Sequence, residues 1–310
     1  MEYRQLGKTS MKLSNLSFGA SSLGGVFHDL DEKEGIKAVH TALDEGINFI
    51  DVSPYYGFTR AETVLGKALK EIKRDRYYLS TKVGRFGENG VKTWDYSAKR
   101  AIESVEESLK RLHIDFIDLI NVHDIEFSDL NQVIHETLPA LVKLKQTGKV
   151  GHVGITGLPL KKLRYVVENV PSGTVESVLS FCHYCLNDDS LIDYVSFFKE
   201  NNVGIINASP LSMGLLTSRG TPEWHPASEK LKKTCSEAAS FCQSKSYPIE
   251  QLAIKFSVSH PAICTTLVST TSSENIKQNI RWANSPLNEK LLPEVNEILK
   301  PVFRETWENS

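Results

Sequence analysis

Short apolar segments alternate along the chain with longer segments in which apolar residues recur every three or four positions. The short segments are rich in β-branched and aromatic residues, which is typical of buried strands. They lie at 16–20, 47–52, 77–83, 116–123, 150–156, 176–184, 203–209 and 263–269. The longer segments have the period of amphipathic helices and lie at 31–46, 61–72, 97–112, 131–148, 158–170, 190–202, 226–260 and 272–280. Eight strand–helix units in one uninterrupted series predict an α/β fold, a closed (β/α)8 TIM barrel, rather than an open sheet.

The residues ahead of the first unit have a different pattern. Residues 2–7 and 11–18 flank a Lys-Thr-Ser turn, which predicts an N-terminal β-hairpin. No linker rich in Pro, Gly or Ser divides the chain, so we expect a single domain over residues 1–310. The long connections at 84–96 and 209–226 follow the third and seventh strands. They are therefore predicted to be loops at the carboxyl end of the barrel strands, where such folds build active sites.

Composition and charge exclude several classes of function. Apolar residues make up 40% of the chain and charged residues 24%, the balance of a soluble globular protein. A formal net charge of −2 and the lack of a basic tract argue against nucleic-acid binding. No apolar run approaches the ~20 residues that a membrane-spanning helix needs. The first ten residues lack the apolar core of a signal peptide, so we expect a cytoplasmic protein without a membrane partner.

The cysteines indicate neither disulfides nor a metal site. Five cysteines, an odd number in a long chain, fit reduced thiols. Cys182 and Cys185 have the spacing of half a zinc or redox site, but no second Cys pair completes it. If 176–184 is a strand throughout, the two thiols point to opposite faces. We therefore expect no metal ion.

Three ionisable residues stand at the ends of successive predicted strands. Asp51 ends the second strand, Lys82 the third and His123 the fourth, and Tyr55 and Tyr56 follow Asp51. Taken singly, Asp51 could be a helix cap, Lys82 a surface lysine and His123 a core residue. Neighbouring parallel strands are about 4.8 Å apart, so their carboxyl ends would bring these groups to one mouth. Together they predict a catalytic site.

The chemistry of these groups indicates proton transfer. A phenol with an ordinary pKa of about 10 is a poor base at neutral pH. A nearby ammonium stabilises the phenolate, and an aspartate paired with the ammonium holds it in place. Such a tyrosine can give a proton to a carbonyl oxygen or take one from a carbinol, while the imidazole orients the substrate oxygen. Side chains cannot carry a hydride, so a nicotinamide cofactor is implied.

The order Asp–Tyr–Lys–His, in the motifs D-x-x-x-x-Y-G, T-K and V-H-D, resembles the aldo-keto reductase superfamily over essentially the whole chain. The family pattern places its catalytic tyrosine five residues after the aspartate, which selects Tyr56 and leaves Tyr55 without a role. The segments DVSPYYG, HDIEF, GITGLPL, ASPLSMGLLT and PEWHPAS resemble the plant-type L-galactose 1-dehydrogenases and related D-arabinose and L-fucose dehydrogenases. This resemblance implies oxidation of the anomeric carbon of an aldose to a lactone. It also implies a phenolate-like Tyr56 beside Lys82 and Asp51.

Neither G-x-G-x-x-G nor a phosphate loop occurs in the sequence. The resemblance to aldo-keto reductases implies instead a dinucleotide that lies extended across the barrel mouth. Residues expected to contact the cofactor are Ala20, Ser21, Asp51, Thr156, Gly157, Ser180, Ser209, Leu211, Met213, Gly214, Leu215, Ser269, Thr270, Asn275, Gln278 and Asn279. Two positions depart from the family pattern. Thr156-Gly157 stands where many relatives have Ser-Asn for the carboxamide. Ala208 stands where many have an aromatic residue that stacks on the nicotinamide.

The adenosine end carries a third departure, which bears on the choice of cofactor. Members that prefer NADPH place cations around the 2′-phosphate, and here Ser269 and Asn275 occupy those positions. A phosphate without a cation loses charge-assisted hydrogen bonds worth roughly 1.5–3 kcal/mol each, and Glu274 would add repulsion. We therefore expect NAD⁺ rather than NADP⁺. Lys277 is the alternative cation, although a helix-surface lysine points to water.

A sugar substrate needs polar groups and an aromatic wall at the mouth. The candidates are Tyr56, His123, Asp124, Trp94, Trp224 and His225, of which Trp224 and His225 could equally be loop packing. L-galactose, L-fucose and D-arabinose share much of their stereochemistry, so the sequence leaves all three open. We expect a monomer or a weak homodimer. Two alternatives remain: an NADPH-dependent aldehyde and ketone reductase, and a non-catalytic regulatory subunit with the same fold.

Overall fold

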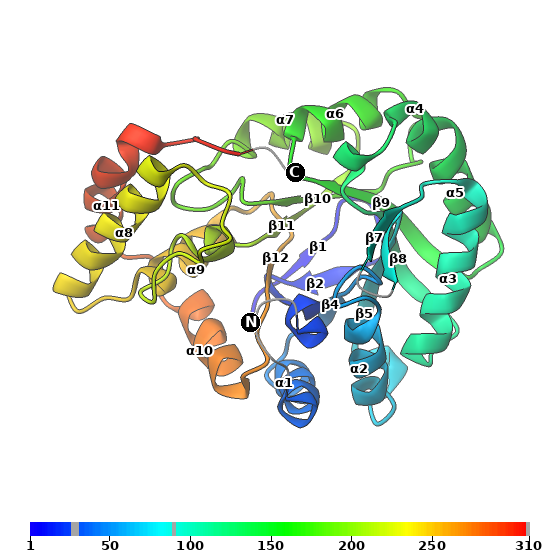
Figure 1. Ribbon diagram of the computed structural model, residues 1–310, viewed down its shortest axis with the longest axis horizontal. Coiled ribbons are helices and arrows are strands. Elements are labelled where there is room, and N and C mark those ends of the chain that lie inside the picture. The colour runs from blue at the N-terminus through cyan, green and yellow to red at the C-terminus, as the bar shows by residue number, and fades with distance from the viewer. Residues whose placement is uncertain (26–30, 89–90, 308–310) are drawn as a thin grey trace.

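The computed structural model describes residues 1–25, 31–88 and 91–307 and contains a barrel of parallel strands (Figure 1). Neighbouring strands pair in chain order, and the last strand pairs with the first to close the barrel. The strands are β3 (Leu16–Gly19), β4 (Phe49–Asp51), β5 (Tyr78–Val83), β8 (Ile117–Val122), β9 (Val150–Gly157), β10 (Ser177–Phe181), β11 (Gly204–Ala208) and β12 (Thr265–Val268). This confirms the predicted (β/α)8 fold.

Helices surround the barrel, as Figure 1 shows. They include α1 (Glu32–Asp44), α2 (Arg60–Leu69), α3 (Ala98–Leu112), α6 (Leu160–Glu168), α7 (Ile192–Glu200), α9 (Ile249–Ser259) and α10 (Ser273–Asn284). A polar side chain fixes the start of several of them. Asp31 accepts hydrogen bonds from two backbone amides of α1, and Ser97 and Ser272 each accept one at α3 and α10. These caps satisfy amides that have no partner within the helix.

The connection 84–96 contains a two-stranded ladder that was not predicted. Strands β6 (Arg85–Glu88) and β7 (Val91–Trp94) pair antiparallel, and residues 89–90 lie outside the described part of the chain. These two strands follow the carboxyl end of β5, so the described part of the first long connection lies at the barrel mouth. It carries Arg85 at its base.

Two predicted helical segments are subdivided. Segment 131–148 consists of α4 (Leu130–Gln132), a π-helical turn (Val133–Thr137) and α5 (Leu138–Gln146). Pro139, at the start of α5, has no amide to donate, and the widened turn precedes it. Segment 226–260 forms α8 (Glu229–Ser244) and α9, and α8 packs against α11 (Leu291–Leu299).

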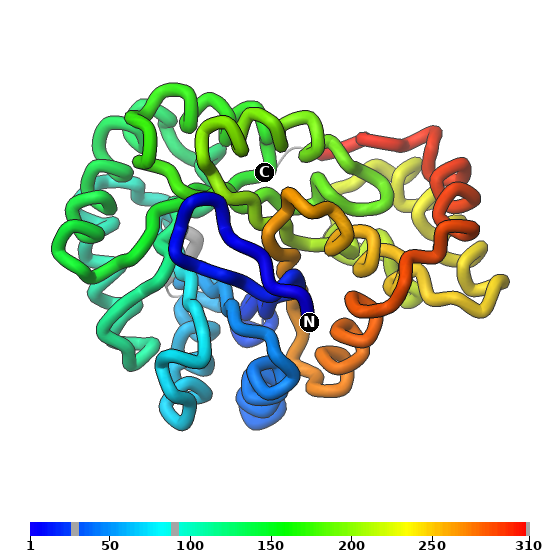
Figure 2. Tube along the Cα trace, turned by 180° about the vertical axis from the view of Figure 1, so that it is seen from behind, coloured from blue at the N-terminus to red at the C-terminus, as the bar shows by residue number. Residues whose placement is uncertain are grey.

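The predicted N-terminal hairpin is present and closes the amino end of the barrel. Strands β1 (Tyr3–Gln5) and β2 (Lys12–Ser14) pair antiparallel, and Figure 2 shows the hairpin lying across the barrel strands. Leu6, Met11 and Leu13 are buried against residues from inside the barrel, such as Phe49 and Leu119. The hairpin therefore fills this end with apolar side chains and leaves the carboxyl end for a site.

The expectation that 176–184 is one strand is wrong at its carboxyl end. Strand β10 stops at Phe181, and Cys182 has a left-handed backbone with φ 63°. Cys182 and Cys185 therefore do not alternate along a strand; the Cys185 thiol donates to the Cys182 carbonyl at 3.2 Å. Burial raises the pKa of Cys182 to about 12. Among residues 1–25, 31–88 and 91–307, no group of His, Cys, Asp or Glu is arranged to hold a metal ion.

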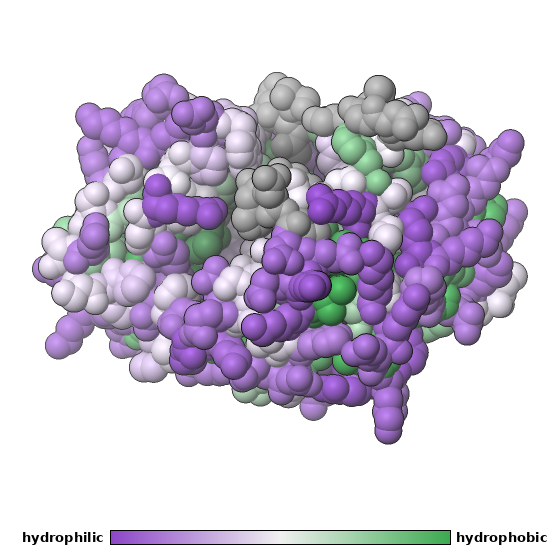
Figure 3. Space-filling model, turned by 60° about the horizontal axis from the view of Figure 1, so that its bottom comes forward, coloured by the Kyte–Doolittle hydropathy of each residue, from purple (hydrophilic) through white to green (hydrophobic). Residues whose placement is uncertain are grey.

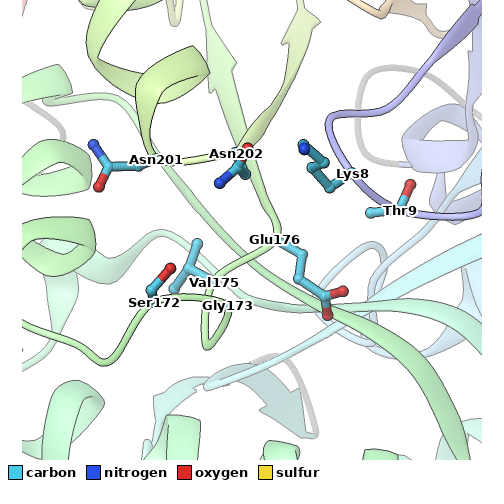
Figure 4. Close-up of a pocket in the computed structure, with 8 residues that line it drawn as sticks. All are labelled: Lys8, Thr9, Ser172, Gly173, Val175, Glu176, Asn201 and Asn202. Carbon is cyan, nitrogen blue, oxygen red and sulfur yellow. The ribbon is translucent and has the colours of Figure 1, made fainter.

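The amino end of the barrel also has a small cavity of about 240 Å3, shown in Figure 4. The lining residues are Lys8 and Thr9 from the hairpin turn, together with Ser172, Gly173, Val175, Glu176, Asn201 and Asn202. Most of these side chains are exposed to solvent, so the cavity is a shallow surface feature.

Hydrophilic side chains cover most of the face shown in Figure 3, where apolar side chains form only small separate patches. In the part of the chain that the structure describes, no helix has the length and apolar character required to cross a membrane.

Candidate active site

A cavity of about 830 Å3 opens at the carboxyl end of the barrel. Most of the residues predicted to bind the cofactor or the substrate line this cavity. They are Ser21, Asp51, Tyr56, Lys82, His123, Asp124, Thr156, Ser209, Leu211, Met213, Gly214, Trp224, Ser269, Thr270, Asn275, Gln278 and Asn279. The barrel therefore gathers groups that are far apart in the sequence, because parallel strands place their carboxyl ends together.

Asp51, Lys82 and Tyr56 form a buried hydrogen-bonded group. Lys82 Nζ lies 2.5 Å from Asp51 Oδ2, 2.8 Å from the Val52 carbonyl oxygen and 3.3 Å from the Tyr56 hydroxyl. The Lys82 and Asp51 side chains are 1% and 4% exposed, so the two charges are compensated by each other and by hydrogen bonds rather than by water. The ammonium thus joins the aspartate to the phenol.

The loop that carries Tyr56 is held against the turn after β3 by two glycines. A Cβ on Gly57, which has φ 61°, would lie 2.1 Å from the Gly24 carbonyl oxygen. A Cβ on Gly24 would lie 2.7 Å from the Tyr56 carbonyl carbon. Only residues without a side chain allow this approach, so the Y-G pair of the sequence motif places the phenol.

His123 lies edge-on to Tyr56, with ring centroids 5.7 Å apart. Its Nδ1 is 3.0 Å from Ser53 Oγ, which accepts a hydrogen bond from the Tyr55 amide at 3.1 Å. The Ser53 hydroxyl therefore has its proton available for Nδ1, which favours the tautomer with hydrogen on Nε2. In this tautomer the imidazole is a hydrogen-bond donor on its Nε2 side.

Asp124 forms an ion pair with Arg85 beside the imidazole. Asp124 Oδ1 accepts a hydrogen bond from Thr156 Oγ1 at 2.9 Å, and Thr156 Oγ1 accepts one from the Asp124 amide. The hydroxyl proton of Thr156, expected to face a carboxamide, thus goes to Asp124. The Arg85 guanidinium lies over the ring of Tyr55, which gives that tyrosine a packing role.

Burial and neighbouring charges set the protonation states. Burial raises the pKa of Tyr56, and Lys82 only partly opposes this while Asp51 adds to it. Burial lowers the pKa of Lys82, but Asp51 and Tyr56 more than offset it, so the value lies above the ordinary one. Burial lowers the pKa of His123 well below its usual range, and Lys82 and Arg85 add to this. At neutral pH these directions favour a neutral imidazole and a protonated Tyr56, so the expected phenolate requires a rise in pH.

The far end of the cavity is polar and uncharged around Ser269. Ser269 Oγ accepts hydrogen bonds from Ser21 Oγ at 2.9 Å and from the Ser22 amide at 3.0 Å, and lies 2.6 Å from Ser22 Oγ. Lys277, the alternative cation, is exposed and does not line the cavity. Arg281 is held on the helix surface by Glu274, at 2.9 Å.

Six predicted residues do not line the cavity: Ala20, Gly157, Ser180, Leu215, Trp94 and His225. Trp94 packs instead against Tyr55, with ring centroids 5.9 Å apart. His225 is buried, with Nε2 3.1 Å from the Ser212 carbonyl oxygen and Nδ1 accepting from the Ala227 amide. Both ring nitrogens of His225 are thus used inside the loop, as in the packing alternative, whereas the neighbouring Trp224 is half-exposed and lines the cavity.

Several lining residues were missed by the sequence reasoning, and three of them bear on the chemistry of the cavity. Arg85 lies in the unpredicted hairpin, for which the Asn-Gly dipeptide was the available signal. Phe181 ends β10 and is in register with Ala208, so an aromatic ring lies beside the position where the expected one is missing. Arg219 lines the cavity and, among the described residues, has no ion-pair or hydrogen-bond partner.

These residues fit a nicotinamide dinucleotide. Such a ligand carries two phosphate charges and two planar rings, and the cavity offers the unpaired Arg219, the aromatic Phe181 and the polar group around Ser269. The start of α10, with its capping Ser272, adds the positive end of a helix dipole near Asn275. Residues at or directly after the carboxyl ends of all eight barrel strands line the cavity.

Comparison with known proteins gives concordant results. Residues 15–300 match the model of the Aldo/keto reductase family. The chain is 45% identical to L-galactose dehydrogenase of Arabidopsis thaliana, over 99% of this chain and 97% of that protein. It is 34% identical to D-arabinose 1-dehydrogenase of Saccharomyces cerevisiae, over 74% of this chain and 71% of the relative. The holo form of an aldo-keto reductase from Bacillus halodurans superposes with a TM-score of 0.81 and 26% identity, covering 100% and 99% of the two chains.

Proposed function

The chain belongs to the aldo/keto reductase family, and from this premise we propose that it oxidises the anomeric carbon of a free aldose to the lactone with NAD⁺. The observation that carries the proposal is the buried group of Asp51, Lys82 and Tyr56 beside His123, in a cavity of about 830 Å3 at the carboxyl end of the barrel. The 45% identity to an L-galactose dehydrogenase supports an aldose as the substrate.

In this proposal His123 and Tyr56 hold the C1 hydroxyl of the sugar. The Nε2 hydrogen of His123 donates to the substrate oxygen, and Tyr56 accepts the hydroxyl proton. Bound NAD⁺ supplies the hydride acceptor. Tyr56 must be ionised to act as the base, so Lys82 serves to stabilise the phenolate. Because burial raises the pKa of Tyr56, the oxidation rate should increase continuously toward alkaline pH.

The residues that would hold the cofactor are those that line the outer cavity. Arg219 would pair with the phosphates, and Phe181 would offer a ring face to the nicotinamide in place of an aromatic residue at Ala208. Ser269, held by Ser21 and Ser22, would bind a ribose hydroxyl but leave a 2′-phosphate without a cation. NAD⁺ is therefore preferred over NADP⁺.

The test is the initial rate of NADH formation with L-galactose, L-fucose and D-arabinose, each with NAD⁺ and with NADP⁺. We expect turnover with NAD⁺ and at least tenfold less with NADP⁺, since one lost charged hydrogen bond costs roughly 1.5–3 kcal/mol. Turnover of none of the sugars, together with NADPH oxidation by simple aldehydes, would refute the proposal.

Two tyrosine variants separate chemistry from packing. Tyr56→Phe should lose nearly all turnover while binding NADH normally, because only the proton acceptor is removed. Tyr55→Phe is the matched control, since its ring packs against Trp94 and under Arg85 and should tolerate loss of the hydroxyl. Near-normal turnover by Tyr56→Phe would contradict the assigned role.

A further inference from the structure

A chain of hydrogen bonds runs from the barrel interior to the catalytic tyrosine. Asn121 Nδ2 donates to Ser80 Oγ at 2.9 Å, and Ser80 Oγ donates to Asp51 Oδ1 at 2.8 Å. The other carboxylate oxygen accepts from Lys82, which contacts the Tyr56 hydroxyl. The strands explain the arrangement, because Asp51 and Ser80 are register partners on β4 and β5, and Lys82 and Asn121 are partners on β5 and β8.

The direction of these hydrogen bonds is fixed by the number of protons. The Ser80 hydroxyl has one proton and accepts from the Asn121 amide, so its own proton goes to Asp51. Asp51 therefore receives one donor on each carboxylate oxygen. The two donors together hold the plane of the carboxylate in one orientation.

Burying the polar side chains of Ser80 and Asn121 costs free energy, which argues that they have a purpose beyond packing. Barrel interiors are usually filled by Val, Ile and Leu, but Ser80 and Asn121 are both fully buried. The Asn121 carbonyl oxygen has no hydrogen-bond partner, although it is buried. The neighbouring strand makes room for this amide, because a Cβ on Gly154 would lie 2.3 Å from Asn121 Oδ1. An apolar residue at position 121 would avoid the cost of burying an amide and the cost of leaving its carbonyl oxygen without a hydrogen bond.

From this geometry we infer that Ser80 and Asn121 are positioning residues for catalysis, a role that rests on the function proposed above. They fix the Asp51 carboxylate, which in turn fixes the Lys82 ammonium within reach of Tyr56. Without the Ser80 proton, the negative charge of Asp51 is less dispersed and its carboxylate is free to turn. The ammonium then stabilises the phenolate less well, and Tyr56 becomes harder to ionise.

The test is Ser80→Ala, with the ionisation of Tyr56 followed directly by NMR of protein labelled with 13C at the tyrosine Cζ. Tyr56→Phe assigns the signal, and the titration uses the protein without sugar or cofactor. We expect the Tyr56 titration to begin about one pH unit higher in Ser80→Ala. The kcat for oxidation should fall by about tenfold with little change in KM. Ser80→Thr keeps the hydroxyl and should restore both.

Ser17→Ala is the matched control, because Ser17 is also fully buried on a barrel strand and its hydroxyl lies 2.6 Å from that of Thr265, away from Asp51. It should leave the Tyr56 titration unchanged even if it lowers thermal stability. Asn121→Leu should shift the titration in the same direction by less, and it serves if Ser80→Ala does not fold. A Tyr56 titration in Ser80→Ala that matches Ser17→Ala would overturn the inference. Because the titration needs no substrate, a shift without sugar oxidation would support the positioning role and reject only the proposed substrate.

Discussion

Removing the charge of Lys82 should destabilise the protein by an amount that depends on pH. Lys82→Met keeps most of the length of the side chain but leaves Asp51 as a carboxylate that is 4% exposed and has lost its ion-pair partner. Breaking a buried ion pair in this way costs about 3–5 kcal/mol, a large share of the 5–15 kcal/mol that stabilises a typical domain. The Ser80 hydrogen bond remains and keeps the cost near the lower end.

The loss should be larger at pH 8 than at pH 5. In the variant, the unpaired carboxylate is easier to protonate in the folded state than in the unfolded chain, where it titrates near 3.9. The folded variant then binds more protons, so its stability decreases as the pH rises above that value. Urea denaturation of Lys82→Met and of the unchanged protein at both pH values measures this difference.

A second substitution tests the cause. Asp51→Asn combined with Lys82→Met removes the unpaired carboxylate charge. The double variant should recover much of the stability at pH 8, although not the activity. The reasoning would be refuted if Lys82→Met cost less than about 1 kcal/mol, or if its cost were equal at pH 5 and pH 8. Either result would mean that water reaches Asp51.

Three further expectations follow from the site. Arg219→Ala should weaken NADH and ADP-ribose binding by roughly tenfold, and adenosine binding little, in calorimetric titrations at low salt. The unfolded chain protonates His123 near 6.5 while the folded pKa lies well below, so stability should fall below about pH 6.5; His123→Gln should flatten this dependence in urea denaturation. Gly57→Ala should cost at least about 2 kcal/mol in thermal unfolding, because its Cβ meets Gly24, and a variant of unchanged stability would contradict that contact.

The barrel could be predicted because its strands have a pattern that few other structures share. Segments such as 77–83 and 150–156 are short and rich in β-branched and aromatic residues, and an amphipathic helix follows each of them in the chain. The hairpin β6–β7 escaped this reasoning because it is polar and lies in a connection. Arg85 was missed for the same reason, because it lies in this hairpin and its partner Asp124 is 39 residues away in the sequence.

The identity of the catalytic residues could be predicted from the sequence, but their pKa values and contacts could not. Asp51, Lys82 and His123 stand at strand ends, which the barrel brings together. The raised pKa of Tyr56 follows from burial, which the sequence does not reveal. The role of His225 likewise depends on two backbone contacts within its own loop.

The N-terminal hairpin has a consequence for how the chain can be assembled on the ribosome. Residues of the hairpin find their partners near the other end of the barrel sequence: Arg4 donates to the carbonyl oxygens of His260 and Ile263, and Leu6 packs against Gly204. Strand β3 likewise pairs with β12, the last strand of the barrel. Domains generally fold as units during synthesis, and here the barrel cannot close until β12 (Thr265–Val268) has been made. Until then a nascent chain carries an open barrel with two unpaired strand edges, so a pause late in translation is the point at which this protein is most exposed to misassembly.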